Sequence, residues 1–446
     1  MELKDSLNGI EHIIMSKFKK NDLNIKTSKL AVIGLGYVGL PLAIEFGKKR
    51  TVIGFDINKN RINELIKGLD SYFEVSSKEF KKSPNLKFTY DINDIKDCKI
   101  FIITIPTPID KKNKPDLSLL KKCCVMISLY IKKGDLIIFE STVYPGVTEE
   151  ICAPIIEKKT GLIFNKDFFC GYSPERINPG DKINKISTII KITSGSTKAI
   201  SKKVDELYKE IVTAGTYNAS SIKIAEAAKV IENIQRDVNV ALINEFAMIF
   251  NKLNINTNSV LEAASTKWNF LPFRPGLVGG HCIGIDPYYL AHKSLEIGHN
   301  PEMILSGRKI NENMPFYVAK QIKNLMIKKK IDLSSSNILI LGFTFKENFP
   351  DTRNTKIADL VKGIRKYNSN IDVYDPWANK DNVKKKYGIN LIDKPVDEKY
   401  DVIVIAVAHD HFKNLSIKQI RTLGRKKHVI YDLKSVINTG EADLKL

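Results

Sequence analysis

A glycine-rich turn set between an apolar run and a helix-compatible segment constrains this chain more than any other feature. The apolar run at residues 29–34 (KLAVIG) leads directly into the sequence GLGYVG at 34–39, and a second apolar run follows at 51–55. Strand, helix and strand in this order form a βαβ unit, whose parallel strands are buried on both faces and read as continuous apolar runs. We therefore predict a parallel α/β sheet that begins near residue 29.

The spacing of these glycines predicts a dinucleotide site. The first glycine allows the tight turn, the second lets the backbone approach a pyrophosphate, and the third allows helix and strand to pack closely, while the helix start offers free N–H groups. Asp56 ends the second strand, seventeen residues after Gly39, where a carboxylate accepts hydrogen bonds from a ribose 2′-hydroxyl and repels a 2′-phosphate. The cofactor expected is therefore NAD. Arg61, one turn further on, either neutralises a phosphate or lies in solvent.

The alternation of strands and helices continues in two blocks. Further apolar runs at 99–105, 135–139 and 186–193 predict one α/β domain to about residue 215, and runs at 337–342, 371–374, 401–406 and 428–431 predict a second. The fold class expected is α/β, with two Rossmann-like parallel-sheet domains joined by a long central helix. The predicted domains are an extension at 1–28 with an amphipathic helix at 5–19, an NAD domain at 29–215, a helical middle at 216–325, and a C-terminal α/β domain at 326–446.

The middle of the chain combines one long helix with a loop-forming segment. Residues 220–252 contain neither Gly nor Pro and are apolar around most of a helix circumference, which predicts a largely buried connector and a candidate dimer surface. Residues 266–301 are rich in Gly, Pro and aromatic side chains, a composition that favours loops over helices.

Charge and hydropathy narrow the possible partners. The net charge is +20, but ten arginines stand against sixty lysines scattered without a dense basic block, so we expect no nucleic acid. The longest apolar stretch, 30–46, is broken by three glycines and a proline, and the first twenty residues lack the pattern of an export signal, so we expect no membrane span and a cytoplasmic protein.

Among the six cysteines, Cys282 alone lies in a glycine-rich loop, GGHCIGID at 279–286. Such a loop leaves a thiol sterically open, and a thiolate is a strong nucleophile once cationic neighbours lower its pKa from ~8.5. The other five lie in strand or helix patterns, and we interpret them as buried and inert: Cys98, Cys123, Cys124, Cys152 and Cys170.

Polar side chains also interrupt the predicted helix and strands. Lys229, Asn233 and Arg236 share one face of the long helix, which is either a solvated face or a stripe facing a cavity. Polar groups follow predicted strands at 140–142, 173–176, 346 and 351–353, where ligands of α/β proteins bind. His409 and His411 are too close together for a convincing metal site, so no metal is expected.

Five motifs together resemble one known family. In chain order these are GLGYVG, SPER at 173–176, Lys-x3-Asn at 229–233, GGHCIGIDP at 279–287 and GFTFKENFPDTRN at 342–354, and the chain resembles the UDP-glucose/GDP-mannose dehydrogenase family from about residue 29 to its end. Arg176 and Ile285 stand where UDP-glucose dehydrogenases usually carry Phe and Lys. With the run KWNF at 267–270, they make the chain most similar to the UDP-N-acetylglucosamine and UDP-N-acetylgalactosamine 6-dehydrogenases of that family.

The resemblance implies roles for individual residues. Cys282 would be the nucleophile, Lys229 and Asp286 would handle protons and stabilise the oxyanion, Asn233 would position the reacting group, and Glu175 would assist thioester hydrolysis. The residues expected to contact NAD are Gly34, Gly36, Tyr37, Val38, Gly39, Asp56, Arg61, Thr107, Thr142 and Arg353. Those expected to hold the sugar nucleotide are Arg176, Ile177, Lys229, Asn233, Arg236, Arg274, Gly279, Phe345 and Lys346.

The resemblance also implies an activity. It is a four-electron oxidation of C6 of UDP-N-acetylglucosamine or UDP-N-acetylgalactosamine to the uronate, through a cysteine thiohemiacetal and thioester, by a homodimer that serves surface polysaccharide biosynthesis. UDP-N-acetylmannosamine or UDP-glucose 6-dehydrogenase activity is the alternative. Less favoured are a single-oxidation dehydrogenase of the hydroxyacid type, which needs neither Cys282 nor a second α/β domain, and a non-catalytic NAD-binding protein.

Overall fold

The computed structural model describes residues 23–177, 181, 184–367, 370–438 and 440–446, and it divides into two compact units at Ile231/Glu232. Each unit contains its own sheet, as predicted. The amphipathic helix expected at 5–19 lies outside the described residues. The division falls inside the segment expected to be a separate middle domain, and the predicted boundaries of that domain stay a prediction.

The first unit is built on an eight-stranded sheet in the order β3-β2-β1-β4-β5-β6-β7-β8. All neighbouring strands run parallel except β6 and β7, which pair antiparallel. The central strand β1 lies between β2 and β4, and Val32 is in register with Gly54 on one side and Ile102 on the other. The strands are β1 (Leu30–Ile33), β2 (Val52–Phe55), β3 (Leu86–Thr89), β4 (Ile100–Ile103), β5 (Asp135–Phe139), β6 (Phe168–Tyr172), β7 (Lys191–Gly195) and β8 (Thr216–Asn218).

Helices of this unit begin at polar caps and bury one apolar face. The side chain of Asn58 accepts hydrogen bonds from the N–H groups of Asn60 and Arg61 at the start of α3, and Thr197 caps α7 in the same way. Leu42 and Phe46 of α2 join a core cluster that also contains Val32 of β1. The helices are α2 (Gly39–Gly47), α3 (Lys59–Ile66), α4 (Ser77–Lys81), η2 (Ile92–Ile95), α5 (Ser118–Ile127), η3 (Val147–Cys152), α6 (Ala153–Thr160) and α7 (Lys198–Lys209).

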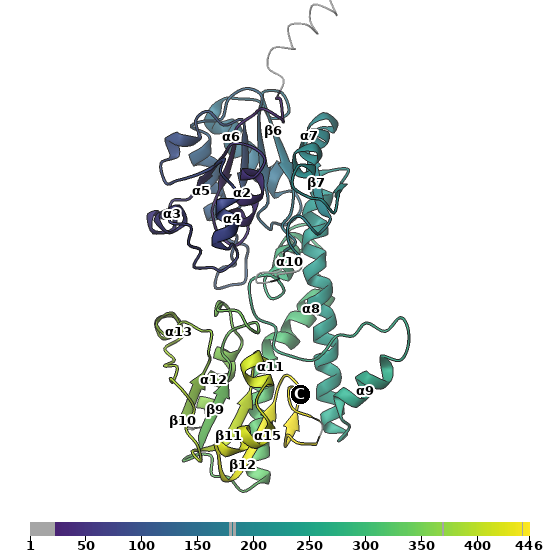
Figure 1. Cartoon of the computed structure of the whole chain (residues 1–446). Coiled ribbons are helices and arrows are strands. Elements are labelled where there is room, and N and C mark those ends of the chain that lie inside the picture. Colours follow the sequence, from purple (N-terminus) through teal and green to yellow (C-terminus); the bar gives the residue numbers. More distant parts are fainter. Residues whose placement is uncertain (1–22, 178–180, 182–183, 368–369, 439) are drawn as a thin grey trace, which may run out of the picture. The chain divides into compact units, whose positions relative to one another are not determined.

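A single helix, α8 (Ile222–Lys252), contributes residues to both units and appears as one uninterrupted ribbon (Figure 1). The prediction of a helix over 220–252 is confirmed. Near its start, buried Glu226 accepts hydrogen bonds from the N–H groups of Gly146 and Thr148, at 2.6 and 3.0 Å, and burial raises the pKa of this carboxyl to about 7.

The second unit carries a five-stranded, all-parallel sheet in the order β10-β9-β11-β12-β13 (Figure 1). Val318 and Ile322 of α11 and Leu360 of α12 pack in one cluster with Ile340 and Val404 of the sheet. The strands are β9 (Asn337–Leu341), β10 (Asn370–Tyr374), β11 (Tyr400–Ile405), β12 (Gly424–Asp432) and β13 (Leu444–Lys445). The helices are α9 (Thr257–Ala264), α10 (Asp286–Glu296), α11 (Glu302–Lys328), α12 (Ile357–Arg365), α13 (Lys380–Tyr387), α14 (Asp410–Lys413) and α15 (Ile417–Thr422).

The predicted fold class is confirmed, and two local predictions are wrong. Residues 266–301 are not all loop, because Asp286 and Pro287 begin α10, where an acidic residue and a proline both favour a helix start. The strand expected from residue 186 begins only at Lys191, since the chain at Lys185–Thr188 is still a hydrogen-bonded turn. No helix within the described ranges has both the length and the apolar character that crossing a bilayer requires.

Candidate functional site

The glycine turn between β1 and α2 has the geometry that its spacing predicts. A Cβ on Gly39 would lie 1.8 Å from the carbonyl oxygen of Gly34 and 2.4 Å from Oγ1 of Thr104, so helix and strand approach too closely for any other residue. Gly34 has a φ of +94°, which favours glycine. A Cβ on Gly36 would meet nothing within 4 Å. The backbone at Gly36 is therefore open to a ligand, while its neighbours are closed by packing.

Asp56 and Arg61 hold this turn in place. The carboxylate of Asp56 accepts hydrogen bonds from the N–H groups of Leu35 and Asn58, both at 2.8 Å. Arg61 is buried and donates from Nε to the Leu35 carbonyl at 3.1 Å, while its Nη2 pairs with Asp70 at 2.7 Å. Arg61 therefore does not lie in solvent, and its guanidinium stabilises the glycine turn through the hydrogen bond to Leu35. Gly36, with its open backbone, and the carboxylate of Asp56 are the groups of this turn that could hold a dinucleotide.

The loops after β4 and β5 are tied to each other beside this turn. Thr107 donates from Oγ1 to the carbonyl of Thr142 at 2.6 Å, and Ser141 donates to the carbonyl of Ile105 at the same distance. Both threonines expected at the NAD site thus lie together. Tyr37 stacks on Tyr72 with ring centroids 4.5 Å apart, and Val38 is the N-cap residue of α2.

The cysteine loop, residues 279–286, belongs to the second unit. Cys282 is exposed and the other five cysteines are buried, which confirms the prediction from the sequence, although Cys98 precedes β4 rather than lying in a strand. Gly280 has a φ of +85°, and a Cβ there would lie 2.8 Å from the ring of Phe345. The carbonyl of Cys282 accepts the N–H of Asp286 at 2.9 Å. The loop is therefore a tight turn that leads into α10 and rests on an aromatic ring.

Asp286 meets the face of α8 that the sequence singled out. Nδ2 of Asn233 donates to Oδ2 of Asp286 at 2.5 Å, and both side chains are buried. Lys229, one helical turn earlier on α8, is also buried. Arg236 is exposed, so the three polar residues do not share one environment: Lys229 and Asn233 are buried, and Arg236 lies in solvent.

The buried stripe continues through Asp237 and Asn244, which the sequence analysis missed. Each residue advances about 100° around a helix, so Asp237 lies about 40° from Asn233, whereas Arg236 lies about 60° away in the opposite direction. Nδ2 of Asn311 and Nη1 of Arg308 both reach Oδ1 of Asp237 at 2.7 Å. The spacing of four residues was the available signal, since it links Lys229, Asn233 and Asp237.

The loop after β9 carries Arg353, which was expected to contact NAD, and Phe345 and Lys346, which were expected to hold the sugar nucleotide. Asp351 receives a bidentate contact from Arg353, with Nε to Oδ1 at 2.9 Å and Nη2 to Oδ2 at 2.7 Å, and lies 3.4 Å from Nε2 of His281. Burial alone would raise the pKa of Asp351, but the nearby His281 ring and the hydrogen bonds from Arg353 outweigh it and hold the pKa below its usual range. Phe345 and Lys346 are partly buried in the same loop. Arg353, Phe345 and the cysteine loop are thus brought together within the second unit.

His409 is a structural residue that this loop depends on. Its Nδ1 accepts the N–H of Asn348 at 2.9 Å, and its Nε2 lies 3.1 Å from Oδ2 of Asp375. Asp375 in turn accepts the N–H groups of Phe343 and Thr344. Both ring nitrogens are therefore used inside the fold. In the part of the chain that the structure describes, no group of three or more His, Cys, Asp or Glu side chains could hold a metal ion.

The remaining expected residues differ in their surroundings. Oε1 of Glu175 accepts the N–H groups of Arg176 and Ile177, both at 2.6 Å, and the Ile177 side chain packs against the first unit's core. The Arg176 guanidinium donates to the carbonyl of Ile190 at 2.8 Å. A Cβ on Gly279 would lie 2.8 Å from the carbonyl of Asn354, and Arg274 is exposed.

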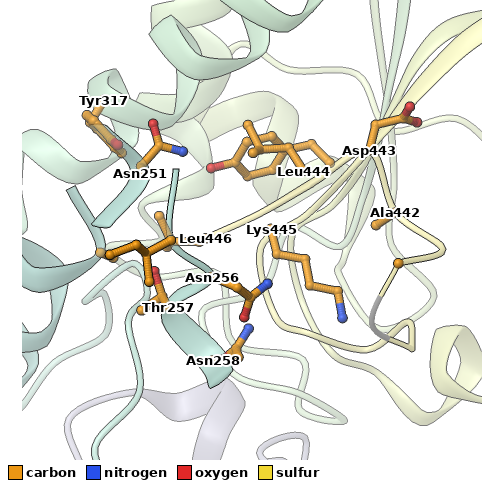
Figure 2. A pocket seen from close by; sticks show the side chains of 14 residues that line it. Asn251, Asn256, Thr257, Asn258, Tyr317, Ala442, Asp443, Leu444, Lys445 and Leu446 are labelled. Carbon is orange, nitrogen blue, oxygen red and sulfur yellow. The ribbon is translucent and has the colours of Figure 1, made fainter. Parts of the chain in front are cut away.

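A cavity of about 310 Å³ in the second unit lies elsewhere. Figure 2 shows Asn251, Asn256 and Asn258 around it, together with Tyr317 and the chain end at residues 442–446. Its lining includes none of the residues that the sequence predicted for catalysis or binding. The expected site therefore does not coincide with this cavity.

Comparison with known proteins agrees with this distribution of residues. Residues 28–212 match the NAD binding domain of the UDP-glucose/GDP-mannose dehydrogenase family, 223–313 match its central domain, and 339–439 match its UDP binding domain.

Individual relatives are similar over nearly their whole length. UDP-N-acetyl-D-glucosamine 6-dehydrogenase of Pseudomonas aeruginosa is 56% identical over 95% of this chain and 100% of its own. The enzyme of that name from Salmonella typhi is 55% identical over 94% of this chain and 98% of its own. The solved structure of UDP-D-ManNAc dehydrogenase from Pyrococcus horikoshii superimposes with a TM-score of 0.84 at 31% identity, covering 94% of this chain and 98% of that one.

Proposed function

The chain belongs to the UDP-glucose/GDP-mannose dehydrogenase family, whose members are NAD-dependent nucleotide-sugar dehydrogenases, and from this premise we propose a specific reaction. The substrate is UDP-N-acetylglucosamine or its C4 epimer, and the product is the corresponding uronate, oxidised at C6. Relatives at 56% and 55% identity that bear the name UDP-N-acetyl-D-glucosamine 6-dehydrogenase support the choice of sugar.

The proposal rests above all on the position of Cys282. It is the exposed cysteine of six, and the turn that carries it ends at a buried aspartate hydrogen-bonded to an asparagine of α8. An exposed thiol beside buried proton-handling groups is the arrangement that covalent catalysis at a carbonyl requires. A single oxidation of an alcohol would need no such thiol.

The proposed sequence of steps converts an alcohol into an acid without releasing the aldehyde. NAD+, when bound, would accept one hydride from C6 in each of the two oxidations. Asp286 takes up the hydroxyl proton as the aldehyde forms, the Lys229 ammonium stabilises the developing oxyanion, and Asn233 orients the reacting oxygen. The Cys282 thiolate then adds to the aldehyde carbon, which gives a thiohemiacetal and, after the second oxidation, a thioester.

Hydrolysis of this thioester completes the reaction. Water adds to the carbonyl carbon while Glu175 accepts one of its protons, and the Lys229 ammonium stabilises the charged tetrahedral oxygen. The C–S bond then breaks, Cys282 returns as the thiolate, and the uronic acid loses its remaining proton to solvent. The balance requires two NADH for each uronate formed.

The decisive assay measures NADH absorbance with a panel of UDP-sugars. We expect UDP-N-acetylglucosamine and UDP-N-acetylgalactosamine to give two NADH per uronate. We also expect their kcat/KM to be higher than that of UDP-N-acetylmannosamine and UDP-glucose. A ratio of one NADH, or a preference for UDP-glucose, would contradict the proposal.

Labelling of the thiol provides an independent check. Iodoacetamide should modify Cys282 first in the folded protein, because the other five cysteines are buried. The labelled enzyme and the C282S variant should melt like the wild type but form no uronate. Uronate formation by C282S at the wild-type rate would exclude the thioester.

A homodimer formed through α8 is part of the proposal. Leu242 and Ile249 lie on one face of this helix and are 44% and 45% exposed, Leu253 directly follows the helix and is 60% exposed, and Trp268 is 92% exposed. Large apolar side chains gathered in this way mark association surfaces. Leu242→Lys with Ile249→Lys should give a monomer in analytical ultracentrifugation, whereas Ile297→Lys, at an exposed site in the same unit, should not.

We also propose the setting of the reaction. A uronate-bearing UDP-sugar is a donor for glycosyl transfer, which supports a role in surface polysaccharide biosynthesis. The catalytic thiol must stay reduced, and the cytoplasm is the compartment in which thiols do so.

A further inference from the structure

A cluster of buried charges lies where three neighbouring strands of the first unit end or begin. Glu140 directly follows β5, Glu175 lies three residues after β6, and Lys191 is the first residue of β7. Tyr208 of α7 completes the cluster, and all four side chains are buried. Only Glu175 has a role in the proposed reaction. The proposed reaction assigns no role to Glu140, Lys191 or Tyr208.

Lys191 lies closer to Glu140 than to Glu175. Lys191 donates from Nζ to Oε2 of Glu140 at 2.9 Å and to the carbonyl of Pro174 at 3.1 Å, and the Tyr208 hydroxyl donates to Oε1 of Glu140. Both oxygens of Glu140 are therefore hydrogen-bonded. Nζ of Lys191 stands 3.6 Å from Oε2 of Glu175, which is beyond hydrogen-bond length.

The Glu175 carboxylate accepts hydrogen bonds through only one of its two oxygens. Oε1 accepts two backbone N–H groups, whereas Oε2 is buried and receives no hydrogen bond from any residue that the structure describes. A buried carboxylate oxygen left in this way calls for an explanation, since such groups are almost always paired. Lys191 forms a longer ion pair with this oxygen, at 3.6 Å, while its hydrogen bonds go to Glu140 and to the carbonyl of Pro174.

Charge counting shows that the two carboxylates compete. One ammonium serves two buried carboxylates, and Arg176, next to Glu175 in sequence, directs its guanidinium to the carbonyl of Ile190. Burial raises the pKa of Glu140 to about 7 against the opposing effect of Lys191. Burial lowers the pKa of Lys191, but the two carboxylates outweigh it and raise that pKa overall.

We propose that Glu140 and Lys191 are positioning residues that keep Glu175 able to accept a proton, because Glu140 takes the hydrogen bond of the Lys191 ammonium and leaves Glu175 only the longer ion pair. The inference rests on the proposed role of Glu175 in thioester hydrolysis. While Glu140 retains the ammonium, Oε2 of Glu175 has a lone pair available for a proton of the attacking water. If Glu140 lost its charge, the ammonium would move to Glu175, and that carboxylate would become a weaker base.

Two substitutions should shift hydrolysis in opposite directions. Glu140→Gln removes the competing charge, so Lys191 pairs with Glu175, and the acid limb of the pH profile for hydrolysis moves to lower pH with a rate at least about tenfold lower. Lys191→Met leaves two facing carboxylates without a cation, so the same limb moves to higher pH. A purely structural role would lower the rate of both variants without opposite shifts.

The matched controls lie in the same unit. Glu210→Gln breaks the ion pair of Glu210 with Arg50, at 3.2 Å, and should leave the pH profile unchanged. Tyr208→Phe removes one donor from Glu140 but keeps the Lys191 pair, so the acid limb should not move to lower pH. Thermal melting of every variant shows which ones fold. If Glu140→Gln does not fold, the shift of the acid limb in Lys191→Met still tests the inference.

The experiment separates thioester formation from thioester hydrolysis. Full-length enzyme is mixed with NAD+ and UDP-N-acetylglucosamine in buffers from pH 6 to pH 9. Samples are quenched with acid at intervals, and intact-protein mass spectrometry detects the adduct on Cys282. We expect the adduct to build up in Glu140→Gln while its NADH burst stays near that of the wild type. Unshifted profiles, or shifts in one common direction, would overturn the inference alone. If neither the wild type nor either variant forms any adduct, the proposed thioester and this inference are overturned together.

Discussion

Two glycines of the turn between β1 and α2 can be tested against each other, because the structure gives them opposite surroundings. A methyl group on Gly39 would stand 1.8 Å from the Gly34 carbonyl oxygen, and ordinary contact begins at 3.4 Å, so α2 must move by 3.4 − 1.8 = 1.6 Å. Gly36 has open space within 4 Å and no positive φ, so a methyl group there meets no protein atom.

The two alanine variants should therefore fail in different ways. Overpacking of this size costs about 3 kcal/mol, and Gly39→Ala should lower the Tm of the first unit by roughly 6–12 °C. Gly36→Ala should melt within about 2 °C of the wild type, because its stability changes by less than about 0.5 kcal/mol. Its methyl group would occupy the approach to the pyrophosphate, so the Kd for NAD should rise about tenfold or more, equal to about 1.4 kcal/mol.

The assay is thermal melting without cofactor, followed by calorimetric titration with NAD. A Gly39→Ala protein that melts like the wild type would refute the close packing of helix on strand. A Gly36→Ala protein with unchanged affinity for NAD would refute the assignment of the open backbone to the phosphates.

Three further predictions follow from individual contacts. Asn233→Ala leaves buried Asp286 without its amide partner and should cost about 1–3 kcal/mol in urea unfolding, whereas Asn239→Ala, on the solvent side of the same helix, should cost little. Arg61→Ala leaves Asp70 with a buried, uncompensated charge and should cost about 3–5 kcal/mol, against less than about 1 kcal/mol for Lys87→Ala at the exposed pair with Asp94; equal losses would contradict the structural role of Arg61. Because the pKa of Asp351 is lower folded than unfolded, its contribution to stability is present above about pH 4 and is lost as the pH falls through the folded value, so Asp351→Asn should show a weaker loss of Tm between pH 5 and 3 than the wild type.

The central strands could be predicted because burial on both faces makes them uniformly apolar. The runs that became β1, β2, β4, β5 and β11 are such strands, and each has a fully or almost fully buried pattern. The strands that were missed lie largely at edges. β3 and β8 are half exposed, so their sequences LKFT and TYN show no apolar run to recognise.

The site divides in the same way. The glycines at 34, 36 and 39 were predictable because their spacing in the sequence alone is typical of a dinucleotide-binding turn. Lys191 was not, because it is a lysine at the start of a strand whose partner Glu140 is 51 residues away in sequence. Asp237 was overlooked for a simpler reason, since Arg236 beside it fits a spacing of seven residues almost as well.

The contact between Gly280 and Phe345 couples two properties that protein engineers usually treat separately. Phe345 is a residue proposed to recognise the sugar nucleotide, and its ring occupies the space into which any side chain at position 280 would project. A smaller residue at 345 would release the turn that carries the sulfur, and a bulkier one would push it. Attempts to widen the range of accepted sugars at this ring will therefore also alter where the nucleophile stands, and a second, compensating change in the loop will be needed to restore the rate.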